Sequence, residues 1–335
     1  MGSKTGIAWT EKTWNPVIGC TKVTAGCDRC YAISTATRMG DHPAYAGTVA
    51  GGEWTGRVNL VEDRLGQPLR WMQPSSVFVN AQSDLFHSGV DDEFVARVFA
   101  VMAVTPRHTF QVLTKRPARM RALLSEVNFL GEDFPDVVAS VLPPPYVYDA
   151  RMVDPAFAER QARKLAAKAT PYIRVYFDWP LPNVHLGVTV ENEATSWRIG
   201  DLVQTPAAHR FISAEPLLSA LTLPRFCACG CKKPFKEVEL DVRLNPGYLN
   251  QDQALASLRS TLGVDQVIVG GESGVGARLM EADWARSIRD QCAARDVPFF
   301  MKQMGSAWGA LNGASGKADQ LADFPEDLRI RQAIR

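Results

Sequence analysis

The chain has 335 residues, of which 46% are hydrophobic and 22% charged, and this composition provides enough apolar side chains for a large globular core. A formal net charge of +1 excludes a protein held on nucleic acid or an anionic membrane by a broad positive field. No export signal is evident, and no apolar run approaches the roughly 18 residues that cross a bilayer. We therefore expect a cytoplasmic protein with no membrane contact.

Apolar strand patterns alternate with amphipathic helix patterns along most of the chain. The strands are expected at 76–84, 108–115, 183–192, 210–218, 264–274 and 298–305. The helices are expected at 91–104, 116–127, 193–205 and 281–297. A cysteine-rich segment at 14–32, followed by a helix pattern at 30–39, adds an opening strand–helix unit. Such alternation is typical of a parallel sheet with helices packed on it.

Seven such units predict an α/β fold, namely a partial or complete (β/α) TIM-type barrel, with a doubly wound open sheet as the alternative. Residues 1–308 would form this single barrel domain. Two insertions interrupt its rhythm: a helical, Pro-rich segment at 127–182 and a cysteine-containing segment at 224–262. Residues 309–335 form a polar C-terminal tail.

In each of the six strand patterns, the apolar run is followed by an ionisable residue. These residues are Asp84, Lys115, Glu191, Glu215, Glu272 and Lys302. In parallel βα folds, the loops after the carboxyl ends of the strands build the active site. Charges next to apolar runs are costly unless they are paired or functional. The pattern predicts a polar, ligand-binding mouth, and the alternative for each single residue is solvent exposure or a structural ion pair.

Six of the seven cysteines form two tight groups, and in a reducing compartment clustered thiols are expected to bind metal rather than to form disulfides. In the first group, Cys20, Cys27 and Cys30 have the spacing C-x6-C-x2-C, which fits neither a zinc ribbon nor a redox C-x-x-C pair. A four-iron cluster needs four ligands, so three thiolates would leave one iron free for an external ligand. The alternatives are a zinc site completed by another side chain and three reduced thiols.

Several segments carry a resemblance to a known family. They are "WNPVIGCTKVTAGCDRCYA", "NAQSDLF", "LTKRP", "NVHLGVTVEN", "RFISAEPLL", "VIVGGESG" and "PFFMKQMG". Together they resemble an uncharacterised phage-associated three-Cys-motif protein family, which is in turn similar to radical S-adenosylmethionine enzymes such as spore photoproduct lyase. The resemblance implies a partial (β/α) barrel and a [4Fe–4S] cluster held by Cys20, Cys27 and Cys30, with S-adenosylmethionine as cofactor. The first cysteine gap is three residues longer than in the usual C-x3-C-x2-C motif of radical enzymes.

The same resemblance suggests residues for the cofactor. "GGESG" is similar to the Gly-Gly-Glu motif that holds the methionyl amine, which makes Gly270, Gly271, Glu272 and Ser273 candidates. In radical enzymes that motif ends the second strand, where this chain has Ser83 and Asp84. As an alternative, "GGESG" is only a tight turn between a strand and a helix.

Further candidates follow from charge at the strand ends. Lys115 and Arg116 precede a helix and suit a carboxylate or phosphate, and Lys302 is placed to contact the same ligand. The alternative is that one of the first two pairs with Glu191 or Glu215. As catalytic candidates we take Glu191, Glu215 and Lys115.

The second cysteine group, Cys227, Cys229 and Cys231, lies in the second insertion and resembles small zinc knuckles. The alternatives are a second iron–sulfur cluster and unmetallated thiols. Lys232, Lys233 and Lys236 follow this group. With the basic pattern at 160–169 and the aromatic residues near 172–177, they are candidates for nucleic-acid contact, or else they are solvated charge and core packing.

Two functional hypotheses follow from these observations. In the first, the protein is a radical-type lyase or transferase that cleaves S-adenosylmethionine reductively, with an external electron donor, and repairs or modifies a nucleic acid or nucleotide. In the second, it is a non-catalytic iron–sulfur or zinc protein that binds nucleic acid or senses redox state. An enzyme requires a fourth cluster ligand from outside the chain, whereas four protein ligands would favour the second hypothesis.

Overall fold

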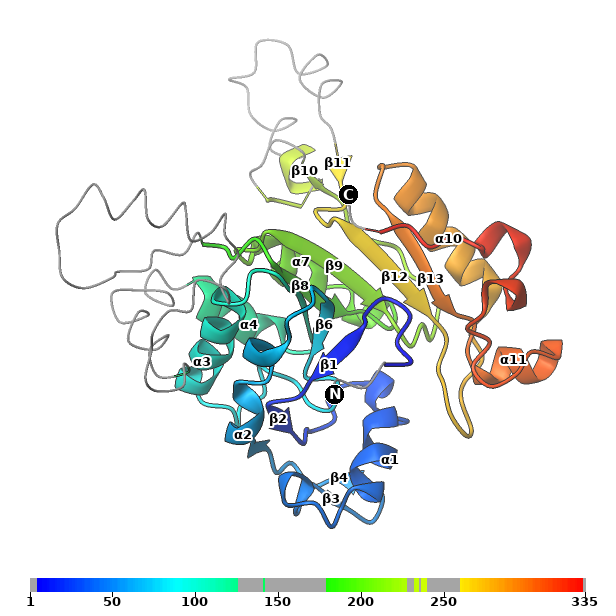
Figure 1. Ribbon diagram of the computed structural model, residues 1–335. Coiled ribbons are helices and arrows are strands. Elements are labelled where there is room, and N and C mark those ends of the chain that lie inside the picture. The colour runs from blue at the N-terminus through cyan, green and yellow to red at the C-terminus, as the bar shows by residue number, and fades with distance from the viewer. Residues whose placement is uncertain are drawn as a thin grey trace, which may run out of the picture. The chain divides into compact units, whose positions relative to one another are not determined.

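A seven-stranded sheet organises the fold. The computed structural model describes residues 5–125, 141, 179–227, 232–234, 236–239 and 260–333 (Figure 1). In sheet order the strands are β1 (Lys12–Trp14), β6 (Ser76–Val79), β7 (Thr109–Thr114), β8 (Val184–Thr189), β9 (His209–Ala214), β12 (Gln266–Gly270) and β13 (Phe299–Gln303). The pairs β1–β6, β6–β7, β9–β12 and β12–β13 are parallel. The predicted parallel sheet is therefore confirmed.

The strand order separates the two predicted architectures. Each new strand in the chain is added beside the preceding one, always on the same side. A doubly wound sheet reverses this direction once, at the point where its ligand binds. Sequential order without a reversal is the order of a (β/α) barrel. The fold is thus an α/β sheet compatible with a partial barrel of the TIM type.

Within the described ranges, the predicted helices form close to their expected positions as α1 (Tyr31–Arg38), α3 (Asp92–Ala103), α4 (Pro117–Ser125), α7 (Arg198–Gln204) and α10 (Ala282–Ala293). The short helices α2 (Glu62–Leu65) and α11 (Ser306–Asn312) were not predicted. Asp91 caps α3 by accepting a hydrogen bond from the amide of Phe94 at 2.6 Å, and Pro117 opens α4, where its missing N–H costs nothing. The helix predicted at 193–205 is divided into a 3-10 turn at Glu193–Thr195 and the shorter α7.

The chain divides into two compact units. Unit 1 contains Met1–Val23, Cys30–Leu186 and Pro206–Ala208, and unit 2 contains Thr24–Arg29, Gly187–Thr205 and His209–Arg335. Within unit 1, the strands bury apolar side chains such as Val77, Val79 and Phe110. Within unit 2, Ile212, Val267 and Met301 form the interior of the sheet.

Unit 1 carries a second, smaller core beside its strands. It consists of Ile18, Ala36, Ala44 and Tyr45, with Val49, Trp54 and Val61 packed against it. The core is enclosed by α1 and by the short antiparallel pairs β2 (Val17–Ile18) with β5 (Asn59–Leu60) and β3 (Val49–Ala50) with β4 (Glu53–Trp54). On the neighbouring surface, Arg97 of α3 pairs with Glu62 of α2 at 2.5 Å and lies over the ring of Phe94.

The insertions lie largely outside the described residues, and the C-terminal segment packs against the sheet. Of 127–182, only 141 and 179–182 are described. Of 224–262, the structure describes a two-strand pair between β10 (Phe226–Cys227) and β11 (Ser260–Thr261). In the tail, Phe324 and Leu328 are buried, and the amide of Met301 donates to Ile330 O at 2.8 Å. The polar composition of this tail gave no indication that it packs against the sheet.

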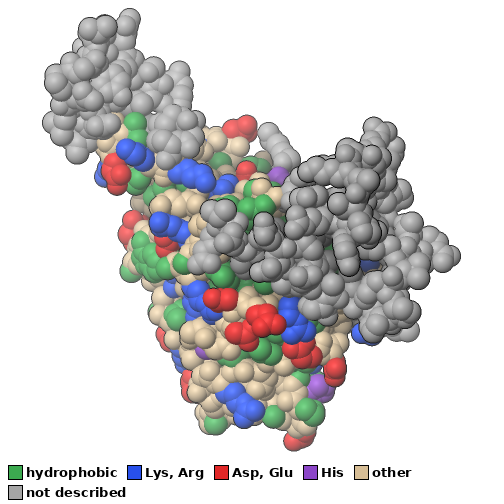
Figure 2. Space-filling view, turned by 90° about the vertical axis from the view of Figure 1, so that its left-hand side faces the viewer, with side chains coloured by type: hydrophobic (Ala, Val, Ile, Leu, Met, Phe, Trp, Pro, Cys, Tyr) green, Lys and Arg blue, Asp and Glu red, His purple; other side chains and the backbone are tan. Residues whose placement is uncertain are grey.

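The described surface is of mixed charge. On the face shown in Figure 2, acidic and basic side chains are interspersed, as the net charge of +1 would suggest. Within the described ranges, the helices are all too short or too polar to span a bilayer.

Candidate functional site

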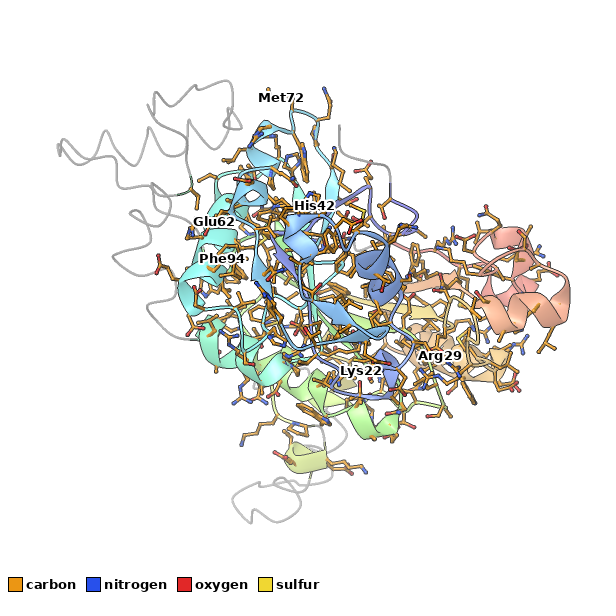
Figure 3. The ribbon with its side chains drawn as sticks, turned by 90° about the horizontal axis from the view of Figure 1, so that it is seen from below. Lys22, Arg29, His42, Glu62, Met72 and Phe94 are labelled. Atoms are coloured by element: carbon orange, nitrogen blue, oxygen red, sulfur yellow. The ribbon has the colours of Figure 1, made fainter. Side chains whose placement is uncertain are left out.

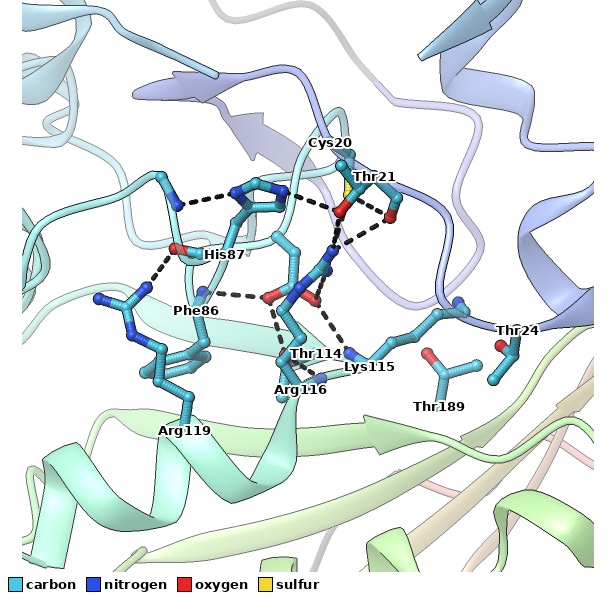
Figure 4. Close-up of polar contacts among 12 residues, drawn as sticks. Cys20, Thr21, Thr24, Phe86, His87, Thr114, Lys115, Arg116, Arg119 and Thr189 are labelled. Carbon is cyan, nitrogen blue, oxygen red and sulfur yellow. Dashed lines mark hydrogen bonds and ion pairs between the residues drawn. The ribbon is translucent and has the colours of Figure 1, made fainter. Parts of the chain in front are cut away.

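In unit 1, the carboxylate of Asp84 accepts four hydrogen bonds (Figure 4). Oδ1 accepts from the amide of Phe86 at 3.0 Å and from the hydroxyl of Thr114 at 2.7 Å. Oδ2 accepts from the amide of Lys115 at 3.0 Å and from Nη1 of Arg116 at 2.9 Å. These donors satisfy the acceptor capacity of a carboxylate, so this side chain joins the end of β7 to the loop after β6.

Arg116 extends from Asp84 to the segment that contains Cys20. Its Nη2 donates to the carbonyl and to the hydroxyl of Thr21, at 3.0 and 2.7 Å, and its Nη1 lies 3.7 Å from the sulfur of Cys20 (Figure 4). Burial lowers the pKa of Arg116, but the charges of Asp84 and Cys20 outweigh burial, and the net shift is upward. The guanidinium therefore stays charged and fixes the backbone beside the first cysteine.

His87 supports the same corner of unit 1. Its Nδ1 accepts from the amide of Gly89 at 2.9 Å, so in the neutral ring Nε2 carries the proton and faces the hydroxyl of Thr21 at 2.9 Å. Burial, followed by the charge of Arg116, lowers the pKa of His87. Arg119 donates to the carbonyl of His87 (Figure 4). The imidazole is thus neutral at pH 7 and acts as a hydrogen-bond donor to the cysteine segment.

The loop after β6 contains two further polar residues. Asn80 has a φ of 59°, a left-handed conformation that asparagine tolerates, and its Oδ1 accepts from the amide of Val17 at 3.2 Å. Ser83, a predicted cofactor residue, donates its hydroxyl proton to the carbonyl of Val17 at 2.8 Å. Both side chains hold the strand that leads to Cys20.

In unit 2, Glu191 forms a buried ion pair with Arg198. The side chains are 1% and 2% exposed, and Oε2 of Glu191 lies 3.1 Å from Nη1 of Arg198. The hydroxyl of Thr24 donates to Oε1 of Glu191 at 2.8 Å. Gly26 fits closely over this carboxylate, because a Cβ on Gly26 would lie 2.4 Å from Oε1. Glu191 therefore holds the part of the cysteine segment that belongs to unit 2.

A second carboxylate–arginine pair in unit 2, Glu272 with Arg278, also holds the cysteine segment. Glu272 accepts from the amide and Nε of Arg278 at 2.8 and 3.0 Å, and from Nη2 of Arg278 at 2.5 Å. Nη2 of Arg278 also donates to the carbonyl of Ala25 at 2.8 Å. Burial raises the pKa of Glu272, but the hydrogen bonds from Arg278 and the charge of Arg29, 3.5 Å away, outweigh burial, and its pKa falls below the ordinary range. Arg29 extends from unit 2 toward solvent (Figure 3).

The glycines of "GGESG" allow close backbone approach. The amide of Gly271 donates to Gln303 O at 3.0 Å, and a Cβ on Gly271 would lie 2.1 Å from the carbonyl oxygen of Met304. The amide of Gly274, whose φ is 104°, donates to the hydroxyl of Ser306 at 3.0 Å. Ser273 lies half-buried in this turn. The turn thus packs against the segment that follows β13.

Glu215 and Lys302 form the remaining strand-end pair. Glu215 follows β9 directly, Lys302 lies in β13, and the two side chains form an ion pair. Gly270 ends β12 between them in the sheet, and a Cβ there would lie 3.2 Å from Cδ of Glu215. The side chains of Lys302 and Glu215 are 12% and 18% exposed. The Glu215–Lys302 pair is therefore more exposed to solvent than the Glu191–Arg198 pair.

Cys20, Cys27 and Cys30 are of intermediate exposure and form no disulfide. Cys20 and Cys30 belong to unit 1, and Cys27 belongs to unit 2. Cys30 is the N-cap of α1, and Cys27 ends the 3-10 turn Ala25–Cys27. Within the described part of the chain, no three His, Cys, Asp or Glu side chains form a preformed metal site. Of the second group, only the backbone of Cys227 is described, and Cys229 and Cys231 lie outside the described residues.

Sequence reasoning did not find the arginine partners. Arg198 and Arg278 stand seven and six residues after the carboxylates that they bind, and His87 stands three residues after Asp84. Each partner lies in the loop or helix that follows a strand-end carboxylate. A search for arginine within eight residues after each strand end would have found Arg198 and Arg278. For Lys115, the structure gives a position directly after β7, with its amide bound to Asp84.

A family model described as a protein of unknown function (DUF5131) matches residues 4–323, so the chain belongs to that family. No curated protein and no solved structure matches the chain.

Proposed function

We propose that this member of the family is an iron–sulfur protein in which Cys20, Cys27 and Cys30 hold a [4Fe–4S] cluster. The observation that carries the proposal is the way the cysteine segment is fixed. Three carboxylate–arginine pairs hold Thr21, Thr24 and Ala25. Buried or half-buried pairs of this kind are costly to build, and in metal sites such outer contacts orient the ligands.

The thiols have surroundings that suit an anionic cluster. Nη1 of Arg116 lies 3.7 Å from the sulfur of Cys20, and N–H groups directed at sulfur are among the features that tune iron–sulfur clusters. Cys30 caps the eight-residue helix α1, whose N-terminus favours negative charge. All three thiols are partly exposed, and none of them forms a disulfide. These surroundings support the proposal that the three thiols hold a cluster.

When bound, such a cluster supplies an electron and one coordination position for an external ligand, for which the family resemblance suggests S-adenosylmethionine. The chain's own residues would keep the three thiols in place. Arg116 would keep positive charge beside the first of them. Together with the resemblance, this arrangement supports reductive cleavage of S-adenosylmethionine, with an external electron donor and with a nucleic acid or nucleotide as substrate.

The cluster is tested by its metal content. Anaerobic reconstitution with iron and sulfide should load the wild-type protein, and each of Cys20→Ala, Cys27→Ala and Cys30→Ala should lose the iron and sulfide of this site. Cys292→Ala is the matched control, because this buried thiol of α10 lies outside the segment. A triple alanine variant at 227, 229 and 231 separates any iron bound by the second group. Full iron content in all three single variants would refute the proposal.

A non-catalytic iron–sulfur protein is the second candidate, and one observation favours it. The carboxylates proposed to receive the methionyl ammonium, Asp84 and Glu272, are both occupied by arginines. A protein that only carries electrons or senses redox state needs no such acceptor. Release of 5′-deoxyadenosine by the reduced, loaded protein distinguishes the two candidates, because only the enzyme produces this compound.

Nucleic-acid contact is supported by three exposed lysines, Lys232, Lys233 and Lys236. Replacing all three with glutamine should weaken the binding of single-stranded DNA and reduce the slope of log K against log salt by about 2, since each phosphate contact contributes roughly 0.7. Lys317→Gln serves as a single-charge control, because Lys317 pairs with Asp319. An unchanged slope in the triple variant would remove these lysines from any nucleic-acid interface.

A further inference from the structure

The charged side chains at the strand ends of unit 2 differ in how much of their hydrogen-bonding capacity is used. Glu191 and Glu272 each bind an arginine and a second donor. Among the described residues, Glu215 and Lys302 bind only each other through their side chains. One oxygen of Glu215 and two protons of Lys302 are left for solvent or for a ligand.

The position of the pair fits a binding site. It lies at the carboxyl end of a parallel sheet, the edge at which such folds bind their ligands. The two residues come from β9 and β13, with β12 between them, so the pair extends over about two strand spacings of roughly 4.8 Å. Because β12 ends in Gly270, no side chain of that residue lies beneath the pair.

The backbone places Lys302 at this point by an irregularity of the sheet. Met301 is paired with Val269, and Gln303 with Gly270, so Lys302 is an extra residue in the register between the two strands. Such shifts redirect a side chain and occur often beside active sites. The side chain of Gln303 contacts the end of the neighbouring strand, because its Nε2 donates to the carbonyl of Gly271, directly after β12, at 2.7 Å.

Lysine differs from arginine in a way that matters here. Arg278 forms a forked contact with Glu272 and cannot release it without leaving a buried carboxylate unpaired. Lys302 offers a single point charge on a flexible stem. The pair can open and accept another pair of opposite charges between its members.

We propose that Glu215 and Lys302 bind the α-amino acid group of a ligand, with the ligand's ammonium on Glu215 and its carboxylate on Lys302. This group carries one positive and one negative charge on two substituents of the same carbon, so it replaces the ion pair with two charge-assisted contacts and leaves the net charge unchanged. A free amino acid and S-adenosylmethionine both carry this group. If the ligand is S-adenosylmethionine, the inference rests on the proposed function. If the ligand is a free amino acid, it does not.

The experiment is calorimetric titration of the full-length, anaerobically reconstituted protein without reductant. The probes are S-adenosylmethionine, methionine, methionine methyl ester, which lacks the carboxylate, and adenosine, which lacks the amino acid. Glu215→Gln and Lys302→Met should each weaken the binding of S-adenosylmethionine or methionine by about 10- to 100-fold, the loss of one charged hydrogen bond. Glu62→Gln, which breaks the exposed pair with Arg97, is the control and should change nothing.

The outcomes distinguish a free amino acid from S-adenosylmethionine as the ligand. They also distinguish failure of this inference from failure of the proposed cluster. Pair-dependent binding of methionine supports a free amino acid, and pair-dependent binding of S-adenosylmethionine alone supports the cofactor. If no cluster forms and methionine still binds through the pair, the proposed function fails while this inference stands. Equal binding by wild type and both variants, or no binding of either amino-acid probe to wild type, would overturn the inference. The swapped variant Glu215→Lys/Lys302→Glu keeps an ion pair and shows whether weaker binding comes from lost folding.

Discussion

The carboxylates at the strand ends of this chain are of two kinds. Asp84, Glu191 and Glu272 each have an arginine partner, and each resulting network holds a residue of the cysteine segment. Glu215 has a lysine partner, and its pair is partly open to solvent. The difference teaches that charge at the end of a parallel strand does not by itself mark a ligand site, because the partner decides whether the charge supports the structure or is available for binding.

The largest loss of stability is expected when the buried carboxylate of Glu191 loses its partner. Arg198→Ala removes the partner of a fully buried carboxylate, so we expect the free energy of unfolding to fall by about 3–5 kcal/mol in urea titration. The double variant Glu191→Leu/Arg198→Met removes both charges and should be clearly more stable than Arg198→Ala. A loss below about 1 kcal/mol in Arg198→Ala would mean that this pair does not support the fold.

The contribution of Glu272 to the stability of the fold is expected to depend on pH. Its pKa in the folded protein lies below the ordinary 4.5, because the contacts from Arg278 and Arg29 outweigh burial. The unfolded chain therefore binds the proton first as pH falls, and the stability that this carboxylate contributes above pH 4.5 is lost as pH passes through the folded pKa. Glu272→Gln lacks this contribution.

The measurement is urea unfolding of both proteins from pH 7 to pH 3. Wild type should exceed Glu272→Gln in stability at pH 7, and the gap should narrow below about pH 4.5. A gap that stays constant over this range would contradict the role of Arg278 as a stabilising partner.

The smallest effect is expected at the open pair. Lys302→Met should lower the free energy of unfolding by about 1–2 kcal/mol, less than Arg198→Ala, because Glu215 is 18% exposed and its carboxylate can be partly hydrated. Thermal and urea unfolding of this variant beside Arg198→Ala compare the two kinds of pair directly. Equal losses in the two variants would abolish the distinction.

The fold was largely predictable, because each strand pattern is a short apolar run with a clear end. The runs before Lys115 and Glu215 stop within one residue of those side chains, and the parallel sheet follows from their alternation with helices. Strand order separated a barrel order from a doubly wound one, and periodicity carries no information about that order. The packing of Phe324 and Leu328 was not predicted, because two apolar residues in a polar tail give no periodic signal.

The site was predictable in its acidic members and not in two of their partners, Arg198 and Arg278. A carboxylate beside an apolar run is conspicuous, whereas Arg198 and Arg278 stand in polar surroundings where arginine is common. Whether a charge has a partner depends on rotamers and on loop geometry, which the sequence does not display. For this reason Asp84 and Lys302 appeared equivalent as ligand candidates before the structure distinguished them.

The account's central claim is a cluster on Cys20, Cys27 and Cys30 with one iron open to an external ligand. The most direct test is the electron paramagnetic resonance spectrum of the reconstituted, reduced protein, recorded anaerobically with and without S-adenosylmethionine. We predict a cluster signal that is absent from the three cysteine variants, present in Cys292→Ala, and changed in shape by S-adenosylmethionine. A signal that survives in the cysteine variants, or one that no added ligand changes, would contradict the claim.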